Sequence, residues 1–345
     1  LAAVLKGMTE YVPESRICGV ILNQISGMLY PRLKQMLEQT LQRMNHSEIK
    51  IVGYLPKADP FVLESRHLGL VTPQELQGLK LQMQQAGEIA NETLDLEGIR
   101  EIAERAEDLK WQQRDACFLK SSFSADQAES GEKRKKRIAV ARDEAFCFYY
   151  KENLEILEQL GAELCYFSPV NDTHLPEDTD GIYLGGGYPE TYRKELADNI
   201  SMKQSICEAA QYGKPIIAEC GGFMYVCDHL IETDDSQEEM LGLINTDVRM
   251  TKRLSMQFGY VTMKALYDTA FFKKDTKIRV HEFHYSKADK RGDACEITKY
   301  SGKCWNGLYV KDKIMAGYPH FYFHNCREVA KRFVDMAEEA STKRC

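Results

Sequence analysis

A cysteine stands at the junction of a predicted strand and a predicted helix in the segment KPIIAECGGFMYVCDHL (214–230). Cys220 follows the apolar run PIIAE and precedes Gly221 and Gly222. A nucleophile at such a sharp, exposed turn is raised clear of the sheet, and small neighbours leave room around it. The first amides of the helix would also favour the thiolate, which is the reactive form of cysteine. The alternative is a structural thiol, because cysteine is often a small buried residue.

Three glycines follow another predicted strand in the segment GIYLGGGYPE (181–190). Their backbone amides can approach a ligand closely because glycine has no side chain. Acyl transfer needs hydrogen-bond donors aimed at the developing oxyanion, and the amides of a glycine turn and of the residue after a nucleophile form a workable pair. A flexible loop is the simpler interpretation of three glycines alone. The turn and the cysteine together favour acyl transfer.

A nucleophilic thiol needs an imidazole that accepts its proton. The chain has eight histidines, and several of them cluster in HEFHYS (281–286) and GYPHFYFHNC (317–326). Any one histidine is more often structural than catalytic. His281 and His284 are three residues apart, so strand alternation would place them on opposite faces, and one of the two is expected to be buried.

Alternating strand and helix patterns surround these residues. Strands are predicted at 137–141, 163–167, 181–187 and 215–219, and helices at 149–162 and 189–213. This alternation predicts a doubly wound α/β sheet, in which functional residues collect at the carboxyl ends of the strands. Cys220 and the glycine turn both lie at such ends.

The first third of the chain has a βαβ pattern of its own. Strands are predicted at 16–24 and 49–56 around a helix at 30–44, which implies a parallel sheet, and further helices are predicted at 72–92 and 95–108. Residues 107–136 lose this periodicity and become polar, serine-rich and charged, as in a linker. The predicted organisation is an α/β domain at 1–106, a linker at 107–136 and a second α/β domain at 137–345.

The composition excludes several classes of function. The 345 residues carry a net charge of −7 that is spread along the chain, so neither nucleic acid nor a membrane is an expected partner. No apolar run is long enough to span a membrane, and no signal peptide is visible. The eleven cysteines are odd in number and form no C-x-x-C pair. They are therefore predicted to be reduced thiols of a cytoplasmic protein, without a disulfide framework or a metal site.

The second predicted domain resembles the cobyrinic acid a,c-diamide synthases, which are glutamine-dependent amidotransferases of corrinoid biosynthesis. Five blocks carry the resemblance in order, and the set is highly specific: RIAVARDEAFCFYYKENLEILEQLGAELCYFSP (137–169), GIYLGGGYPE (181–190), PIIAECGGFMY (215–225), HEFHYS (281–286) and AGYPHFYF (316–323). The first domain resembles the later part of the same family's ATP-binding domain, through GVILNQ (19–24), IVGYLP (51–56) and ESRHLGL (64–70).

The resemblance implies a fold and a reaction. The fold is a truncated P-loop-type parallel α/β domain followed by a flavodoxin-like class I glutamine amidotransferase domain. Cys220 would attack the carboxamide of L-glutamine and give a thioester and ammonia, His320 would carry the proton, and the amides of Gly187 and Gly221 would hold the oxyanion. Ammonia would then amidate the a and c carboxylates of cobyrinic acid, activated by ATP with Mg²⁺, which makes the protein a carbon–nitrogen ligase.

Further contacts with the tetrapyrrole, or between the domains, are assigned to residues at two places in the second domain. These are Arg142, Asp143 and Glu144 at the end of its first strand, and His281, Glu282 and His284 in the HEFHYS block. A solvated loop is an equally good interpretation of the first group.

The sequence departs from the family pattern twice. Glutaminases of the broader thiol-triad class place a glutamate two residues after the histidine, where this chain has Tyr322. The corrinoid branch resembles a Cys–His pair, so the group that orients His320 stays open. The phosphate-binding pattern G-x-x-x-x-G-K-[ST] is also not found. Leu1 is therefore expected to lie well inside the ATP domain, and the ATP and Mg²⁺ site of the full-length enzyme is expected to be incomplete here.

Alternative functions remain at this stage. Within the class, the substrate could be nickel-sirohydrochlorin or hydrogenobyrinate instead of cobyrinate. From other classes, a thiol hydrolase on the same fold and a non-catalytic remnant are the rivals. The sequence does not fix the central metal, the order of amidation or the oligomeric state, for which a homodimer is one candidate.

Overall fold

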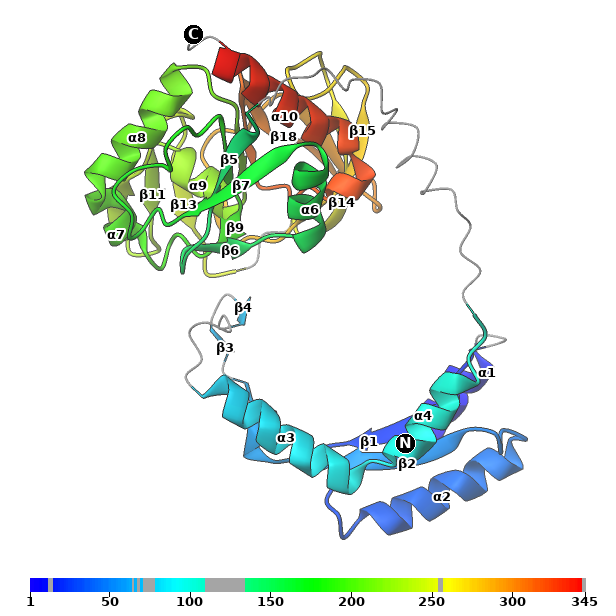
Figure 1. Ribbon diagram of the computed structural model, residues 1–345. Helices are drawn as coiled ribbons and strands as arrows, with labels where there is room; N and C mark the ends of the chain where they lie inside the picture. The colour runs from blue at the N-terminus through cyan, green and yellow to red at the C-terminus, as the bar shows by residue number, and fades with distance from the viewer. Residues whose placement is uncertain are drawn as a thin grey trace. The chain divides into compact units, whose positions relative to one another are not determined.

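The structure is a computed structural model that describes residues 1–11, 15–63, 65–66, 69–70, 78–108, 134–253 and 257–342. The chain divides into two compact units, Leu1–Glu129 and Ser130–Cys345, and each is described by itself (Figure 1). Most of the predicted linker at 107–136 and the predicted helix start at Thr72 lie outside the described residues. The domain limits 1–106, 107–136 and 137–345 stay a prediction.

The first unit contains the predicted βαβ motif. Its elements are α1 (Ala2–Glu10), β1 (Gly19–Asn23), α2 (Tyr30–Arg43), β2 (Lys50–Leu55), η1 (Asp59–Phe61), β3 (Ser65–Arg66), β4 (Gly69–Leu70), α3 (Leu79–Thr93) and α4 (Leu96–Glu104). β1 and β2 pair in parallel, with Gly19 opposite Lys50, which confirms the prediction. Leu37 and Leu41 lie one helical turn apart on α2, and both are buried against the strands.

The second unit is built on a six-stranded sheet among the described residues, in the order β19-β20-β10-β8-β5-β7. The strands are β5 (Lys136–Ala141), β7 (Ala162–Phe167), β8 (Gly181–Leu184), β10 (Ile216–Glu219), β19 (Tyr309–Lys311) and β20 (Ile314–Gly317). All neighbours pair in parallel except the edge strand β19. The parallel strands thus have the flavodoxin-like order 2-1-3-4-5, and the predicted doubly wound sheet is confirmed.

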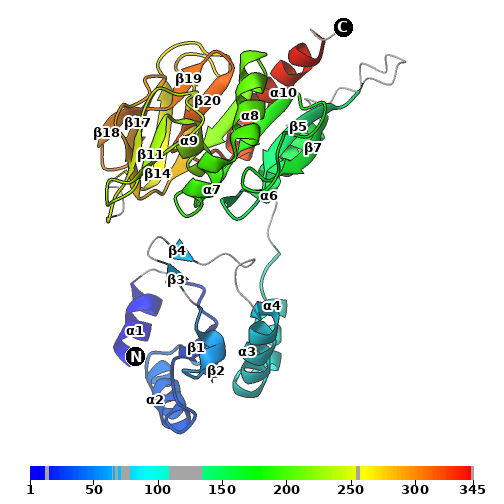
Figure 2. The same ribbon diagram turned by 90° about the vertical axis from the view of Figure 1, so that its left-hand side faces the viewer.

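Helices cover both faces of this sheet. They are α6 (Lys151–Gln159), α7 (Arg193–Asp198), α8 (Ile200–Gln211), α9 (Gly221–Val226) and α10 (Arg327–Thr342). Figures 1 and 2 show α6 and α10 on one side of the sheet and α8 on the other. The single helix predicted at 189–213 is two helices, because Asn199 ends α7 and caps α8 by accepting a hydrogen bond from the amide of Met202 at 3.3 Å.

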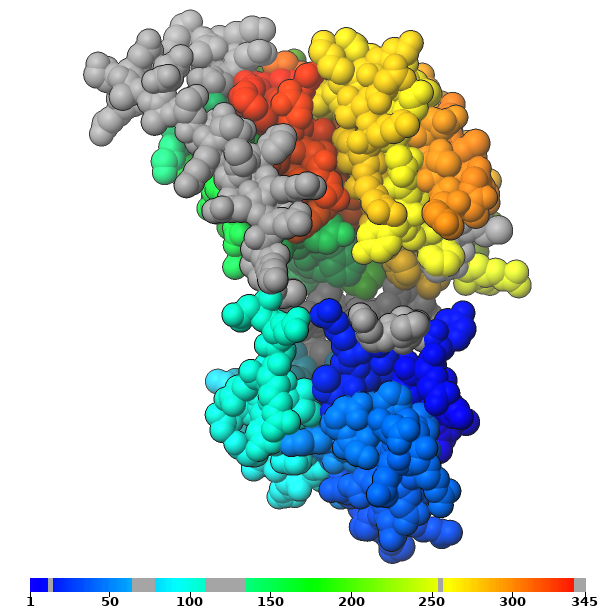
Figure 3. All heavy atoms as spheres, turned by 90° about the vertical axis from the view of Figure 1, so that its right-hand side faces the viewer, coloured from blue at the N-terminus to red at the C-terminus, as the bar shows by residue number. Residues whose placement is uncertain are grey.

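Two four-stranded sheets, the first mixed because β11 and β13 pair in parallel and the second antiparallel, are inserted between α9 and β19, and the sequence did not predict them. One has the order β12-β11-β13-β16 and the other β15-β14-β17-β18. Their strands are β11 (His229–Ile231), β12 (Gln237–Glu239), β13 (Val248–Met250), β14 (Gly259–Ala265), β15 (Lys277–Glu282), β16 (Ser286–Ala288), β17 (Cys295–Lys299) and β18 (Cys304–Gly307). The second sheet shares its apolar core with α10, and Figure 3 shows its yellow and orange residues beside that red helix.

Candidate functional site

Cys220 lies where β10 ends and α9 begins, as the sequence predicted. Its backbone has φ 49° and ψ −98°, a conformation that residues with a side chain rarely adopt. Two backbone hydrogen bonds hold it there: the Cys220 amide donates to the carbonyl of Gly317 at 2.8 Å, and the Met224 amide donates to the carbonyl of Cys220 at 3.0 Å. A strained turn fixed from both sides is typical of a nucleophile presented at a sheet edge.

The expectation of an exposed thiol is wrong. The Cys220 residue is only 7% exposed, and its Sγ lies 3.7 Å from the carbonyl oxygen of Phe283. Burial, together with the carboxylate of Glu190, raises the pKa of this thiol to about 12, although the amide of Gly221 acts in the opposite direction. The expected stabilisation of the thiolate by the helix is therefore outweighed by desolvation, and the thiol needs a base.

Gly221 and Gly222 serve close packing and not clearance. A Cβ at position 222 would lie 2.2 Å from the carbonyl oxygen of Leu184, at the end of β8. A Cβ at position 221 would lie 2.9 Å from the amide nitrogen of Gly187. The Gly222 amide donates to the carbonyl of Gly185 at 2.8 Å, which fastens the two turns together. The structure thus brings together Gly187 and Gly221, the two residues predicted to hold an oxyanion.

The glycine turn is held by a short two-stranded ribbon. β9 (Gly186–Gly187) pairs antiparallel with β6 (Phe146–Phe148). A Cβ at position 187 would lie 1.9 Å from the carbonyl oxygen of Ala145, so only glycine allows the strands to approach this closely. The position of the glycine turn therefore depends on its pairing with β6, a strand that the sequence did not predict.

His320 lies three residues beyond the end of β20. It forms an isolated bridge with His281, in which the His320 amide donates to the His281 carbonyl at 2.8 Å and the His281 amide donates back at 3.2 Å. Its ring packs against Gly186, where a Cβ would lie 2.6 Å from Cε1. Burial, with a smaller effect of His281 and His284, lowers the pKa of the imidazole to about 4. His320 is therefore neutral at neutral pH, as a base must be.

The HEFHYS block places its residues differently from the strand alternation that we expected. β15 ends at Glu282, so His284 lies beyond the strand and alternation does not apply to it. His284 is the buried histidine of the pair, stacked on Tyr318 with 3.6 Å between ring centroids. Its Nδ1 lies 2.8 Å from the carbonyl of Ser286, and its Nε2 lies 3.7 Å from Oε2 of the buried Glu282.

The Arg142–Glu144 segment forms a tightly bonded loop. Asp143 accepts four hydrogen bonds, from the amides of Ala145, Phe146 and Val170 and from the hydroxyl of Ser168, each at 2.9 Å. Its carboxylate therefore fixes the loop that leads to β6. Arg142 lies 5.1 Å from the ring centroid of Tyr166, and Glu144 accepts from the side chain of Asn171 at 3.3 Å. A contact of this segment with substrate or another domain stays a prediction.

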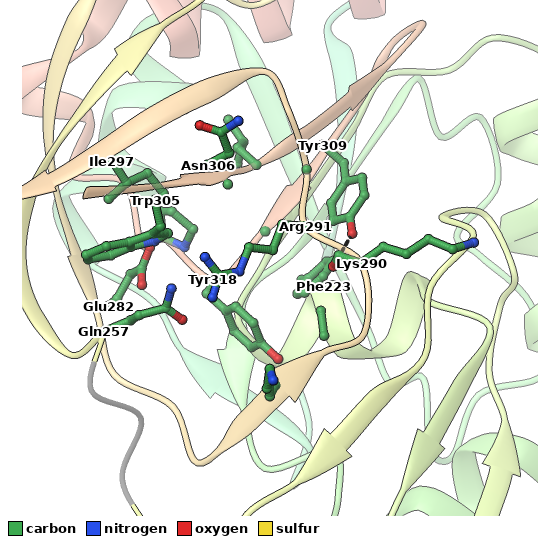
Figure 4. Close-up of a pocket in the computed structure, with 17 residues that line it drawn as sticks. Phe223, Gln257, Glu282, Lys290, Arg291, Ile297, Trp305, Asn306, Tyr309 and Tyr318 are labelled. Atoms are coloured by element: carbon green, nitrogen blue, oxygen red, sulfur yellow. Dashed lines mark hydrogen bonds between the residues drawn. The ribbon is translucent and has the colours of Figure 1, made fainter. Parts of the chain in front are cut away.

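A pocket adjoins the HEFHYS block and the end of β20, on the side of the inserted sheets. Its lining includes Glu282, Arg291, Trp305, Tyr318 and Pro319, so it touches both the HEFHYS block and the segment that leads to His320. Figure 4 shows Arg291, Trp305 and Tyr318 around it, together with the hydrogen bond from the Tyr309 hydroxyl to the Lys290 carbonyl. No sequence pattern pointed to Arg291 or Trp305, because they come from strands and loops that were not predicted.

Glu219 is the other site residue that the sequence reading missed. It directly precedes Cys220, is only 3% exposed, and accepts hydrogen bonds from the Phe321 amide and the Tyr183 hydroxyl. Burial raises the pKa of its carboxyl to about 8. An acidic residue at the end of an otherwise apolar buried strand is the signal that could have identified it.

No group of three or more histidine, cysteine or acidic residues is placed to hold a metal ion among the residues that the structure describes. The nine described cysteines form no disulfide with one another. None of the described helices combines the length and apolar character needed to cross a bilayer.

Comparison with known proteins identifies first the class and then the family. Residues 137–328 match the family of CobB/CobQ-like glutamine amidotransferase domains. Cobyrinate a,c-diamide synthase of Priestia megaterium is 36% identical over 99% of this chain and 71% of its own length. The same enzyme of Caldanaerobacter subterraneus subsp. tengcongensis is 35% identical over 99% and 72%, and that of Listeria innocua 37% over 94% and 68%.

The chain therefore belongs to the cobyrinate a,c-diamide synthase family, whose members are glutamine-dependent amidating ligases of cobalamin biosynthesis. The resemblance noted in the sequence is confirmed. Among solved structures, PurLQS from Thermotoga maritima aligns with 60% of this chain and 99% of its own, at 19% identity and a TM-score of 0.42.

The strain at Cys220 predicts an order of stability between two inactive variants. Glycine adopts a positive φ freely, whereas alanine retains strain of about 1–3 kcal/mol, against which the unfolded-state entropy of glycine costs about 0.4–1 kcal/mol. Cys220→Gly should therefore exceed Cys220→Ala in free energy of unfolding by about 1 kcal/mol in urea denaturation. Equal stability, or a more stable alanine variant, would show that the turn is not strained.

The packing of Gly222 predicts a linked loss of stability and activity. Gly222→Ala forces its Cβ towards the Leu184 carbonyl, so it should cost about 1–3 kcal/mol of stability and shift the cysteine turn. Glutamine hydrolysis should fall at least tenfold. The matched control is Gly87→Ala in α3, where a Cβ meets nothing within 4 Å and stability should be kept or raised. A Gly222→Ala protein with the parent's stability and activity would contradict this packing argument.

Proposed function

We propose that the second unit hydrolyses L-glutamine at Cys220 with His320 as the base, and that the ammonia amidates the a and c carboxylates of cobyrinate in an ATP-driven reaction. The observation that carries the proposal is the meeting of three parts at one sheet edge. The strained Cys220 turn, the Gly187 amide beside Gly221 and the imidazole against Gly186 come from three different strand ends. This is the arrangement that acyl transfer to a thiol requires.

The first half of the reaction is acyl transfer from glutamine to the Cys220 thiol. The neutral imidazole of His320 takes the proton of the Cys220 thiol, and the sulfur forms a bond to the carboxamide carbon of glutamine. The amides of Gly187 and Gly221 stabilise the oxyanion of the tetrahedral intermediate. The carbon–nitrogen bond then breaks as the imidazolium returns the proton to the leaving nitrogen, which gives ammonia and a thioester. Water hydrolyses the thioester to glutamate and restores the thiol.

Burial determines when the proton transfer from the thiol to the imidazole becomes favourable. A thiol with a pKa of about 12 does not ionise by itself at neutral pH, and an imidazole with a pKa of about 4 is a weak base towards it. Proton transfer is therefore unfavourable until a substrate carbonyl accepts the charge of the thiolate. This limits reaction of the thiol with other electrophiles when glutamine is not in place.

The second half of the reaction is proposed on the family relationship. Each carboxylate would be activated by ATP as an acyl phosphate, Mg²⁺ would neutralise the phosphates, and ammonia would displace phosphate to form the amide. No described residue is assigned to ATP, because the sequence shown contains no G-x-x-x-x-G-K-[ST] motif. Cobyrinate is preferred as substrate because relatives that cover nearly all of this chain carry that name.

The role of His320 is tested by asparagine variants of the four downstream histidines. His320→Asn should lower glutamine hydrolysis a hundredfold or more, as expected for the loss of a general base. His324→Asn is the nearest control, because His324 lies in the 3₁₀ helix η2 (Phe323–Asn325) and is exposed. The assignment would be refuted if His320→Asn hydrolysed glutamine within about threefold of the parent rate while His281→Asn or His284→Asn lost this activity.

The substrate is tested by offering the full-length protein different tetrapyrroles. With glutamine, ATP and Mg²⁺, mass spectrometry should show a doubly amidated product from cobyrinate at a rate at least tenfold above that from nickel-sirohydrochlorin or hydrogenobyrinate. The measure is kcat/KM for each tetrapyrrole. A higher kcat/KM with either alternative would replace cobyrinate by that substrate, and would leave the glutaminase proposal intact.

A further inference from the structure

The imidazole of His320 has no side-chain hydrogen-bond partner among the described residues. The position two residues later is Tyr322, whose ring contacts those of Tyr150 and His324 at centroid distances of 5.2 and 5.3 Å. Across the described ranges, no residue forms a hydrogen bond with either ring nitrogen of His320. The orientation of this ring must therefore be set by its packing against Gly186 and by the backbone that carries it.

That backbone is held at nearly every step. The His320 amide and carbonyl bond with His281. The carbonyl of Phe321 accepts from Nδ2 of Asn153 at 2.7 Å, and the amide of Phe323 donates to Oδ1 of the same side chain at 2.7 Å. The Phe321 amide, which is the first group after His320, donates to Oε1 of Glu219 at 3.1 Å. Asn153 holds the segment from α6, whereas Glu219 holds it from the strand that carries the nucleophile.

An ionisable side chain is energetically unfavourable at the buried position of Glu219. It is buried at the end of β10, and its second oxygen accepts only from the Tyr183 hydroxyl, at 3.0 Å. Among the described residues no cation pairs with it. Ionising a carboxyl that is buried without a cation is costly, and this one also raises the pKa of the adjacent thiol. Its retention beside a nucleophile therefore points to a role beyond packing.

We propose that Glu219 is the positioning residue for the catalytic base: by accepting the Phe321 amide it fixes the backbone next to His320 relative to the residue next to Cys220. One side chain thus ties the position before the nucleophile to the position after the base. This replaces the orienting contact that Tyr322 does not supply. The proposal rests on the proposed function, in which His320 accepts the thiol proton.

The geometry separates two ways in which Glu219 could act. If the acceptor position matters, Glu219→Gln should work, because its Oε1 can still accept from Phe321 and its NH₂ can donate to Tyr183. Glu219→Asp should fail, because the shorter side chain withdraws the acceptor from the amide. If the negative charge matters, the two results should be reversed. Glu219→Met removes every acceptor at similar volume.

The test is a double-mutant cycle in glutamine hydrolysis with the whole chain. Glu219→Met and Glu219→Asp should each lower kcat at least tenfold, because a displacement of a catalytic group by about 1 Å can lower the rate up to 10²-fold. The KM for glutamine should change less than threefold. Glu219→Gln should stay within threefold of the parent. The control Tyr183→Phe, which removes the bond to the second oxygen together with the hydroxyl's interaction with Asn153, should also stay within threefold.

The second half of the cycle repeats Glu219→Met and Glu219→Asp in the His320→Asn background. A residue that acts only through His320 should then lower the residual kcat less than threefold. If the Glu219 substitutions lower kcat by equal factors in both backgrounds, their role is structural and the proposal is overturned. An active Glu219→Asp protein or an inactive Glu219→Gln protein would also overturn it. The aspartate variant keeps the test decisive if the methionine variant does not fold. A His320→Asn protein with parental activity would refute the base itself, which is a separate outcome.

Discussion

The site depends on one close approach, between the turn that carries Cys220 and the turn that ends β8. The hydrogen bond from the Gly222 amide to the Gly185 carbonyl fastens them, and the Leu184 carbonyl leaves no room for a side chain at position 222. This approach places the amide of Gly187 next to Gly221 and the Cα of Gly186 under the His320 ring. The positive φ of Cys220 is the conformational cost of turning the chain within that space.

Desolvation is the second consequence of the same packing. The turn, the HEFHYS block and the β20 segment enclose the thiol, so its pKa rises to about 12, while that of His320 falls to about 4. The pKa of Glu219 rises to about 8 in the same surroundings. All three groups therefore favour their neutral forms, and charge develops only during the reaction. In such a site fixed donors such as backbone amides act strongly, because little water competes with them.

The sequence predicted the parts that follow from strong local patterns. The parallel strands follow from short apolar runs that alternate with helical periodicity, and the position of Cys220 at a strand-to-helix turn follows from its two glycines. The inserted strands were missed, because short strands such as β11, β12 and β16 have three residues each and show little periodicity. The burial of Cys220 and the end of β15 before His284 depend on packing between distant segments, which one sequence does not reveal.

Glu219 illustrates the same limit. Its place in the sequence marks it as unusual, but its partners Phe321 and Tyr183 are 102 and 36 residues away. Only the fold shows that the strand that ends at Cys220 also holds the backbone next to His320. Asn153 is comparable, since it lies on α6 and binds a segment about 170 residues later.

The central claim, that Cys220 is the nucleophile of a glutaminase, is tested most directly by covalent labelling. The protein is treated with a chloroketone analogue of glutamine and mapped by mass spectrometry of its peptides. Label on Cys220 alone, with protection by excess glutamine, is the result that the account predicts. Label chiefly on Cys227 or Cys147 would contradict the claim, and so would a rate of labelling that excess glutamine does not lower.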